Sequence, residues 1–120
     1  MKKTTLKEEL LISGLDDWAY AAWVLQTVRL SGLTEYAALR ALAIGLIAEL
    51  ITEGLVVPGE IDDKGHVPWR CTNGEAIERI TAEWLKEWAD ESPTPGAIVW
   101  LDNTPAGDEV ARAALDREKA

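Results

Sequence analysis

The chain has 120 residues, 48% of them hydrophobic, and its formal net charge at pH 7 is −9. This length and hydrophobic content exclude a disordered chain and predict a single domain over residues 1–120 with its own core. The only cysteine, Cys71, excludes an internal disulfide, and Lys7, Glu8 and Glu9 interrupt the apolar stretch that a signal peptide would need. These features favour a soluble protein of the reducing cytoplasm.

The negative charge is spread over the chain after residue 14, and it restricts the classes of partner. Nucleic-acid binding is disfavoured because it depends largely on Lys and Arg neutralising phosphates, and no basic run is present. Binding to an anionic membrane surface is disfavoured for the same reason. A basic protein partner would be attracted. The alternative is that the charge only keeps a hydrophobic protein soluble.

Two short helices are predicted before residue 31. Thr5 and Glu8 have the spacing of a capping box, and Gly14 follows the helix that they would open. Asp16 or Asp17 can cap a second helix that runs to about residue 30. The residues expected to face the core are Leu6, Leu10 and Leu11 in the first helix and Trp18, Ala21, Ala22, Val24, Leu25 and Val28 in the second.

The stretch 36–51 is the most apolar part of the chain and predicts the central helix. Large aliphatic residues recur in it at three- and four-residue spacing, and the opposite face is small or apolar as well. Such a helix must be covered by protein on most sides or lie in lipid. Because Arg40 and Glu49 interrupt the apolar run, we expect a core helix and not a membrane span. Thr34 is the predicted N-cap, and Gly54 is the predicted stop.

An irregular β-hairpin over residues 55–70 and a further strand over 97–101 are predicted next. Pro58 and Pro68 restrict the hairpin to sheet edges or bulges. The stretch 97–101 is short, β-branched and apolar on both faces, so we expect a buried strand that pairs with the hairpin.

Two more helices flank that last strand in the sequence. Thr72 and Glu75 form a second capping-box pattern, and the helix that they open runs to about residue 89. Thr104 followed by Pro105 predicts the start of a last helix. The predicted fold class is therefore α+β, mostly helical with a small antiparallel β-sheet. The residues expected to face inward are Ile77, Ile80, Trp84, Leu85 and Trp88 in the first of these helices and Ala106, Val110, Ala113 and Ala114 in the last.

The order helix, short turn, helix and hairpin over residues 16–70 resembles the winged-helix family. The segment from Glu49 to Trp69, ELITEGLVVPGEIDDKGHVPW, looks like the end of a winged-helix recognition helix running into its wing. The resemblance implies a compact α+β domain that binds DNA through the second helix of the pair. The matching helix here offers Arg40 and little else, and the acidic hairpin tip would repel phosphate, so we expect the fold without strong DNA binding.

The hairpin carries the polar residues closest to a chemical motif. Asp62, Asp63 and His66 lie within five residues, but closed zinc sites usually need paired Cys or His ligands, and the chain has one of each. Cys71 and His66 form the only nucleophile–base pair, and on one strand their odd separation would place them on opposite faces. We therefore expect no metal, no cofactor and no enzymatic activity, with Cys71 as a small core or edge residue.

Six tryptophans and no phenylalanine are unusual for a chain of this length. Trp18, Trp84 and Trp88 lie at helical spacing and are expected to supply core bulk. Trp23 lies off the main stripe of its helix, and Trp69 lies between Pro68 and Arg70 on a predicted edge strand. Interfaces are enriched in Trp and Arg, so an exposed Trp69 would be a candidate anchor for a partner. A buried contact between the hairpin and a helix is the alternative for Trp69.

These observations predict a non-enzymatic acidic protein-interaction module, in one version an immunity or antitoxin-type inhibitor of a basic partner protein. The second hypothesis is a winged-helix transcriptional regulator that binds DNA as a homodimer. The predicted partner-binding residues are Asp62, Asp63, Trp69, Glu83 and Glu87.

Overall fold

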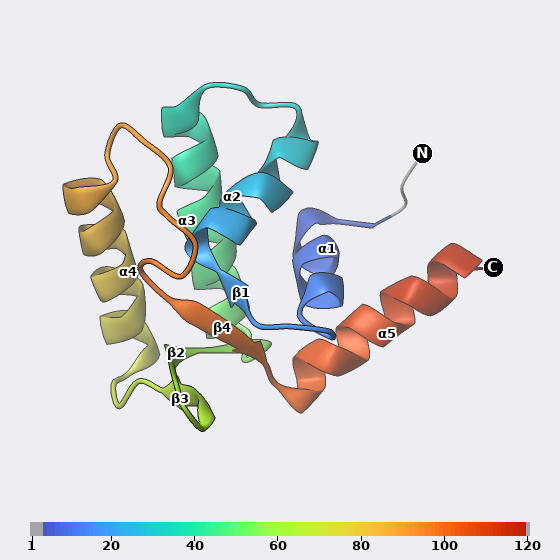
Figure 1. Cartoon of the computed structure of the whole chain (residues 1–120). Helices are drawn as coiled ribbons and strands as arrows, with labels where there is room; N and C mark the ends of the chain where they lie inside the picture. The colour runs from blue at the N-terminus through green and yellow to red at the C-terminus, as the bar shows by residue number, and fades with distance from the viewer. Residues whose placement is uncertain (1–3, 120) are drawn as a thin grey trace.

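Residues 4–119, which the computed structural model describes, form five α-helices and a four-stranded antiparallel sheet, so the predicted α+β class is confirmed. Figure 1 shows α1, α2 and α3 together on one side of the sheet, with α4 and α5 at opposite flanks. None of the described helices is long and apolar enough to cross a membrane. The helices are α1 (Leu6–Ser13), α2 (Ala21–Val28), α3 (Tyr36–Thr52), α4 (Asn73–Glu87) and α5 (Pro105–Lys119), with the 3-10 turn η1 (Arg29–Ser31); the strands are β1 (Ala19–Tyr20), β2 (Val56–Asp62), β3 (Gly65–Pro68) and β4 (Trp100–Asn103).

The sheet has the strand order β1-β4-β2-β3. The predicted hairpin is confirmed as β2 and β3, and β4 pairs with β2 as expected. Pro58 lies in β2, an inner strand, although it was predicted at an edge or a bulge. Its carbonyl oxygen accepts a bond from the Trp69 N–H at 3.1 Å, beyond the last pair of the β3 ladder. The N–H that proline lacks would point to this same side, toward Trp69 and away from β4, so the pairing of β2 with β4 loses no bond.

The predicted start of the second helix at Asp16 or Asp17 is wrong. β1 pairs with β4, with Tyr20 opposite Trp100, and α2 begins only at Ala21. The apolar spacing of residues 18–28 concealed this strand, because two residues have no period of their own and their pairing depends on a distant segment.

α3 is the central helix, as predicted, but protein covers only one of its faces. Its end is the expected one: Gly54 has a φ of 72°, and the Leu55 N–H donates to the Leu50 carbonyl oxygen at 3.0 Å. Thr34 is not the N-cap, since Glu35 takes that position without a side-chain cap bond. The buried residues are Leu39, Ala43, Leu46, Ile47, Leu50 and Ile51, and the exposed ones on the outer face include Ala37, Ala41 and Gly45.

α4 begins with the predicted capping box, in which the side chains of Thr72 and Glu75 each accept the other's backbone N–H. Its inner face follows four-residue steps through Ala76, Ile80 and Trp84. Leu85 was predicted on this face but is 48% exposed, because it lies about 100° further round the helix than its neighbour.

Tyr36 and Arg40 of α3 hold the end of α4. The Trp84 indole N–H donates to the Tyr36 hydroxyl at 3.0 Å, and that hydroxyl donates to the Trp88 carbonyl oxygen at 2.6 Å. The Arg40 guanidinium donates to the carbonyl oxygen of Ala89 and lies over the Tyr36 ring. Arg40, the one cation within the apolar stretch 36–51, therefore holds the end of α4 against α3.

β4 starts later than predicted. The apolar run from residue 97 is interrupted at Ile98, whose φ of 77° is incompatible with a continuous strand. Ile98 and Val99 are nevertheless buried, as the run of apolar residues indicated, and regular pairing begins at Trp100.

α5 begins where it was predicted to begin, but part of its buried face differs from the prediction. Thr104 is the N-cap, and its hydroxyl oxygen accepts the Gly107 N–H at 3.1 Å. Ala106 and Ala113 were predicted to face inward but are exposed. Ala114 is buried as predicted, and Gly107 and Ala111 are buried as well. Gly107 allows a close approach to the Leu55 backbone, just before β2.

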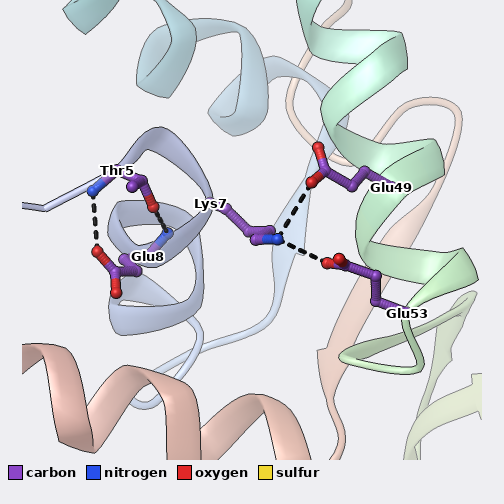
Figure 2. Close-up of polar contacts among 5 residues, drawn as sticks. All are labelled: Thr5, Lys7, Glu8, Glu49 and Glu53. Carbon is purple, nitrogen blue, oxygen red and sulfur yellow. Dashed lines mark hydrogen bonds and ion pairs between the residues drawn. The ribbon is translucent and has the colours of Figure 1, made fainter.

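Ion pairs tie α1 to the end of α3 and to α5. Figure 2 shows the Lys7 ammonium reaching Glu49 at 3.1 Å and Glu53 at 2.7 Å, beside the predicted capping box of Thr5 and Glu8. The hydrogen bonds that the ammonium donates to Glu53 and then to Glu49 raise the pKa of Lys7 above 10.5. The stabilisation from this ammonium is therefore complete below about pH 10.5 and is lost as the pH rises through the folded-state pKa.

We expect Glu8→Gln to lower stability at pH 7 by about 0.5 kcal/mol, a value usual for a partly exposed ion pair. The hydrogen bond from Arg117, followed by the bond from the Thr5 backbone N–H, holds the pKa of Glu8 below its ordinary 4.5. A lowered pKa contributes stability above pH 4.5 that is lost as the pH falls through the folded-state value. Urea unfolding at pH 7 and about pH 2.5 should show the difference between parent and variant disappearing in acid. Glu78→Gln, on the exposed side of α4, is the control, and a difference that persists in acid would contradict the expectation.

Candidate binding surface

The predicted partner-binding residues do not form one cluster. Asp62 and Asp63 lie at the exposed tip of the β2–β3 hairpin, whereas Glu83 and Glu87 lie in the second half of α4. Figure 1 shows α4 beginning near the hairpin and running away from it. Asp62 also shapes its own turn, since its Oδ1 accepts the backbone N–H of Lys64 at 2.7 Å.

Trp69 forms the hairpin–helix contact that was the alternative to an exposed anchor. It is half-buried and packs against the core cluster. The Arg79 guanidinium of α4 lies 3.8 Å from the centre of its ring, and the same guanidinium is 3.3 Å from a Glu60 carboxylate oxygen of β2. The Trp69 ring thus joins the hairpin to α4 through an arginine held between an indole and a carboxylate.

His66 and Cys71 do not form a nucleophile–base pair. The His66 Nε2 lies 3.0 Å from the Trp100 carbonyl oxygen, and its ring packs over Gly59. Cys71 is exposed in the loop before α4, so its predicted place in the core or at a sheet edge is wrong. Among residues 4–119 no group of three His, Cys, Asp or Glu side chains is arranged to hold a metal ion.

A hollow of about 280 Å³ lies where the end of α1, β1 and α2 meet. Three aromatic side chains line it, and Asp17 is the one charged residue in its wall. Small-molecule and side-chain sites are typically concave and mostly apolar, with a few polar groups that fix orientation. The lining residues are Ser13, Asp17, Trp18, Ala19, Tyr20 and Trp23.

The rings of this hollow are held in place by neighbouring groups. Trp23 is 44% exposed, and its indole N–H donates to the Ser13 hydroxyl oxygen at 3.0 Å. Tyr20 contacts Trp100 on the paired strand edge-to-face, with ring centres 5.2 Å apart. The Asp17 carboxylate accepts the backbone N–H of the next residue at 2.8 Å. The aromatic walls and the carboxylate are therefore preorganised.

An acidic hollow of about 330 Å³ adjoins the aromatic one, and the two share Asp17 and Trp18. Four carboxylates line it, those of Asp16, Asp17, Asp102 and Asp108, and no Lys or Arg lines either hollow. We call the two hollows together the aromatic–acidic surface. Its acidic and aromatic side chains are Asp16, Asp17, Trp18, Tyr20, Trp23, Asp102 and Asp108.

Asn103 holds the two halves of the acidic hollow together. Its side-chain amide donates to the Leu11 carbonyl oxygen at 2.8 Å and to Asp108 Oδ1 at 3.1 Å. It can do so because Gly14 faces it: a Cβ at that glycine would lie under 3.0 Å from the Asn103 side chain. The glycine predicted to end the first helix therefore also admits the amide that links α1 to α5.

Sequence reasoning did not find this surface. Trp18 was predicted to face the core from a helix, but it lies in the loop before β1. The position of Trp23 off the apolar stripe of its helix is the one sequence signal that indicated this surface. Asp102 and Asp108 join the surface only because β4 pairs with β1 and α5 packs beside α1, as Figure 1 shows.

Comparison with known proteins gives no family for this chain, since no family model, curated protein or solved structure matches it.

Proposed function

We propose that this protein is a non-enzymatic module that binds a basic protein partner through its aromatic–acidic surface. One observation carries the proposal: a hollow lined by four carboxylates adjoins a hollow walled by three aromatic rings, with no Lys or Arg in either lining. Aromatic side chains are enriched in binding hot spots, and carboxylates at the rim steer a cationic partner and set its orientation. The net charge of −9 adds a long-range attraction for the same cationic partner.

An inhibitor of the immunity or antitoxin type is one concrete version of this function. Such a protein would cover basic residues of its target, and this chain offers carboxylates from three segments: the loop before β1, β4 and α5. We place it in the cytoplasm within the same proposal, because the exposed thiol of Cys71 suits a reducing compartment.

The test compares two variants of equal net charge. The surface variant carries Asp16→Asn, Asp17→Asn, Asp102→Asn and Asp108→Asn. The control variant loses four carboxylates elsewhere, through Asp63→Asn, Glu78→Gln, Glu83→Gln and Glu87→Gln. Binding of a 20-residue poly-L-lysine is measured by calorimetry at about 50 and 300 mM salt.

We expect the surface variant to bind poly-L-lysine about tenfold more weakly than the parent, equivalent to about 1.4 kcal/mol. The control variant should lose less than about threefold, and all binding should weaken with salt. Equal losses in the two variants would mean that net charge alone attracts the polymer, and the proposal would fail. Thermal unfolding of both variants checks that the fold is intact.

A winged-helix regulator that binds DNA as a homodimer is the second candidate, because α2, α3 and the β2–β3 hairpin follow one another in the order of that family. The outer face of α3 argues against this candidate, because the described residues of this helix offer no free cation for DNA. Its exposed residues include Ala37, Ala41 and Gly45, and Arg40 is bonded to α4. A gel-shift with random duplex at low salt, where electrostatic binding is strongest, separates the candidates. We expect no shift, and light scattering of the same sample reports the oligomeric state.

A further inference from the structure

The aromatic hollow contains the kinds of group that bind an arginine side chain, namely aromatic rings and a carboxylate. Its wall brings together indole and phenol rings and the Asp17 carboxylate, and no cation lies among its lining residues. Aromatic faces attract cations, and they do so most strongly where water is partly excluded. A carboxylate beside the ring adds a charge-assisted hydrogen bond for a guanidinium.

The same chain already holds one arginine in this way. Arg79 lies over the Trp69 ring at 3.8 Å while Glu60 contacts its guanidinium at 3.3 Å. The aromatic hollow repeats the combination of indole and carboxylate with Trp23, Trp18 and Asp17, and it is open to solvent instead of being filled from within.

We infer that this hollow binds one arginine side chain of the basic partner, an inference that rests on the proposed function and names the residue that enters. The guanidinium plane lies against an indole face, and its N–H groups donate to the Asp17 carboxylate. Trp23 cannot turn away freely, because its indole N–H is bonded to Ser13. The hollow of about 280 Å³ admits one side chain, and the acidic hollow beside it receives neighbouring cations of the same segment.

Arginine fits these groups better than lysine does. The guanidinium is planar and weakly hydrated, so it can stack on an indole and bond a carboxylate at the same time. An ammonium is a compact, strongly hydrated charge that does not stack. Asp17 keeps acceptor capacity for the ligand, since its Oδ1 takes one backbone N–H and a carboxylate offers about four lone-pair sites.

The test uses three pentapeptides that differ only in the central residue, which is arginine, lysine or citrulline. Citrulline has nearly the shape of arginine and no charge. Two-dimensional NMR of the ¹⁵N-labelled full chain follows the six indole N–H signals during titration. We expect the arginine peptide to bind about tenfold more tightly than the citrulline peptide and to shift the Trp18 and Trp23 signals first.

Two variants place the binding in the hollow. Trp23→Leu and Asp17→Asn should each weaken the arginine peptide about tenfold, whereas Asp63→Asn, an exposed aspartate at the hairpin tip, should not. Both altered side chains are exposed, so unchanged thermal unfolding is expected. Equal binding of arginine and citrulline, lysine binding as tightly as arginine, or arginine binding unaffected by Trp23→Leu would each overturn the inference.

The two proposals fail in different ways. If poly-L-lysine discriminates the surface variant from its control but the pentapeptides do not discriminate arginine, the acidic module stands and the arginine site is wrong. If poly-L-lysine does not discriminate the variants, the proposed function itself is wrong.

Discussion

Trp84→Ala is expected to lower the free energy of unfolding by about 3–5 kcal/mol, the range for truncating a fully buried tryptophan. The Trp84 side chain has no exposed surface and lies in the core cluster. Its loss leaves a cavity and removes the donor to the Tyr36 hydroxyl. That hydroxyl lies 2.6 Å from the Trp88 carbonyl oxygen and 2.7 Å from that of Glu91, so the end of α4 and the following loop lose support together. Urea unfolding at 25 °C and pH 7 measures the change.

The neighbouring residue supplies the control. Leu85→Ala alters the same helix turn, but Leu85 is 48% exposed, so its loss should stay within about 1 kcal/mol. A domain of this size has a total stability of about 5–15 kcal/mol, and the Trp84 variant could therefore begin to unfold below 37 °C. Similar losses at the two positions would mean that the buried indole does not hold α4 to α3.

Local signals in the sequence predicted most of the helices correctly. The two capping boxes, Thr5 with Glu8 and Thr72 with Glu75, set the starts of α1 and α4, and Gly54 set the end of α3. Each of these signals acts within one helical turn, through side chains and backbone groups close together in the chain. The α+β class followed from these helices together with the predicted hairpin over residues 55–70 and the strand over 97–101.

The errors lie where distant segments decide the structure. β1 exists because Tyr20 pairs with Trp100, and no local pattern marks a two-residue strand. The burial of Gly107 in α5 was missed because this glycine meets the Leu55 backbone just before β2, and apolar periodicity does not reveal such a contact. Pro58 fits an inner strand only because the β3 ladder ends beside it.

The aromatic–acidic surface was missed for the same reason. Acidic residues are frequent in this chain, so their number cannot show which of them meet. Asp17 and Asp102 come together through the β1–β4 pairing, and Asp108 joins them because Asn103 bonds it. The residues chosen from sequence, such as Asp62 and Glu87, are exposed on separate elements. Exposure and charge can be predicted from the composition. Which carboxylates line the same hollow can be known only from the fold.

Gly107→Ala is expected to destabilise the protein by about 1–3 kcal/mol, the range for overpacking a buried site. Alanine normally stabilises a helix by about 1 kcal/mol relative to glycine, so packing must reverse the usual sign. A Cβ at residue 107 would lie under 3.0 Å from the Leu55 carbonyl oxygen, which also accepts the Thr104 N–H at 3.0 Å. The Leu55 backbone, just before β2, cannot move away without weakening the bond that fixes the start of α5. Thermal and urea unfolding measure the loss.

Gly45→Ala is the matched control, because Gly45 lies within α3 and a Cβ there would have no neighbour within 4 Å. This change should stabilise the protein by about 0.5–1 kcal/mol, opposite in sign to the change at Gly107. Stabilisation at both glycines would show that α5 does not pack closely on the Leu55 backbone. The Gly107 variant should also bind poly-L-lysine more weakly than the Gly45 variant, since Asp108 of the acidic hollow is the next residue of the displaced turn. A variant destabilised at Gly107 with unchanged binding would separate the packing of α5 from the geometry of the surface.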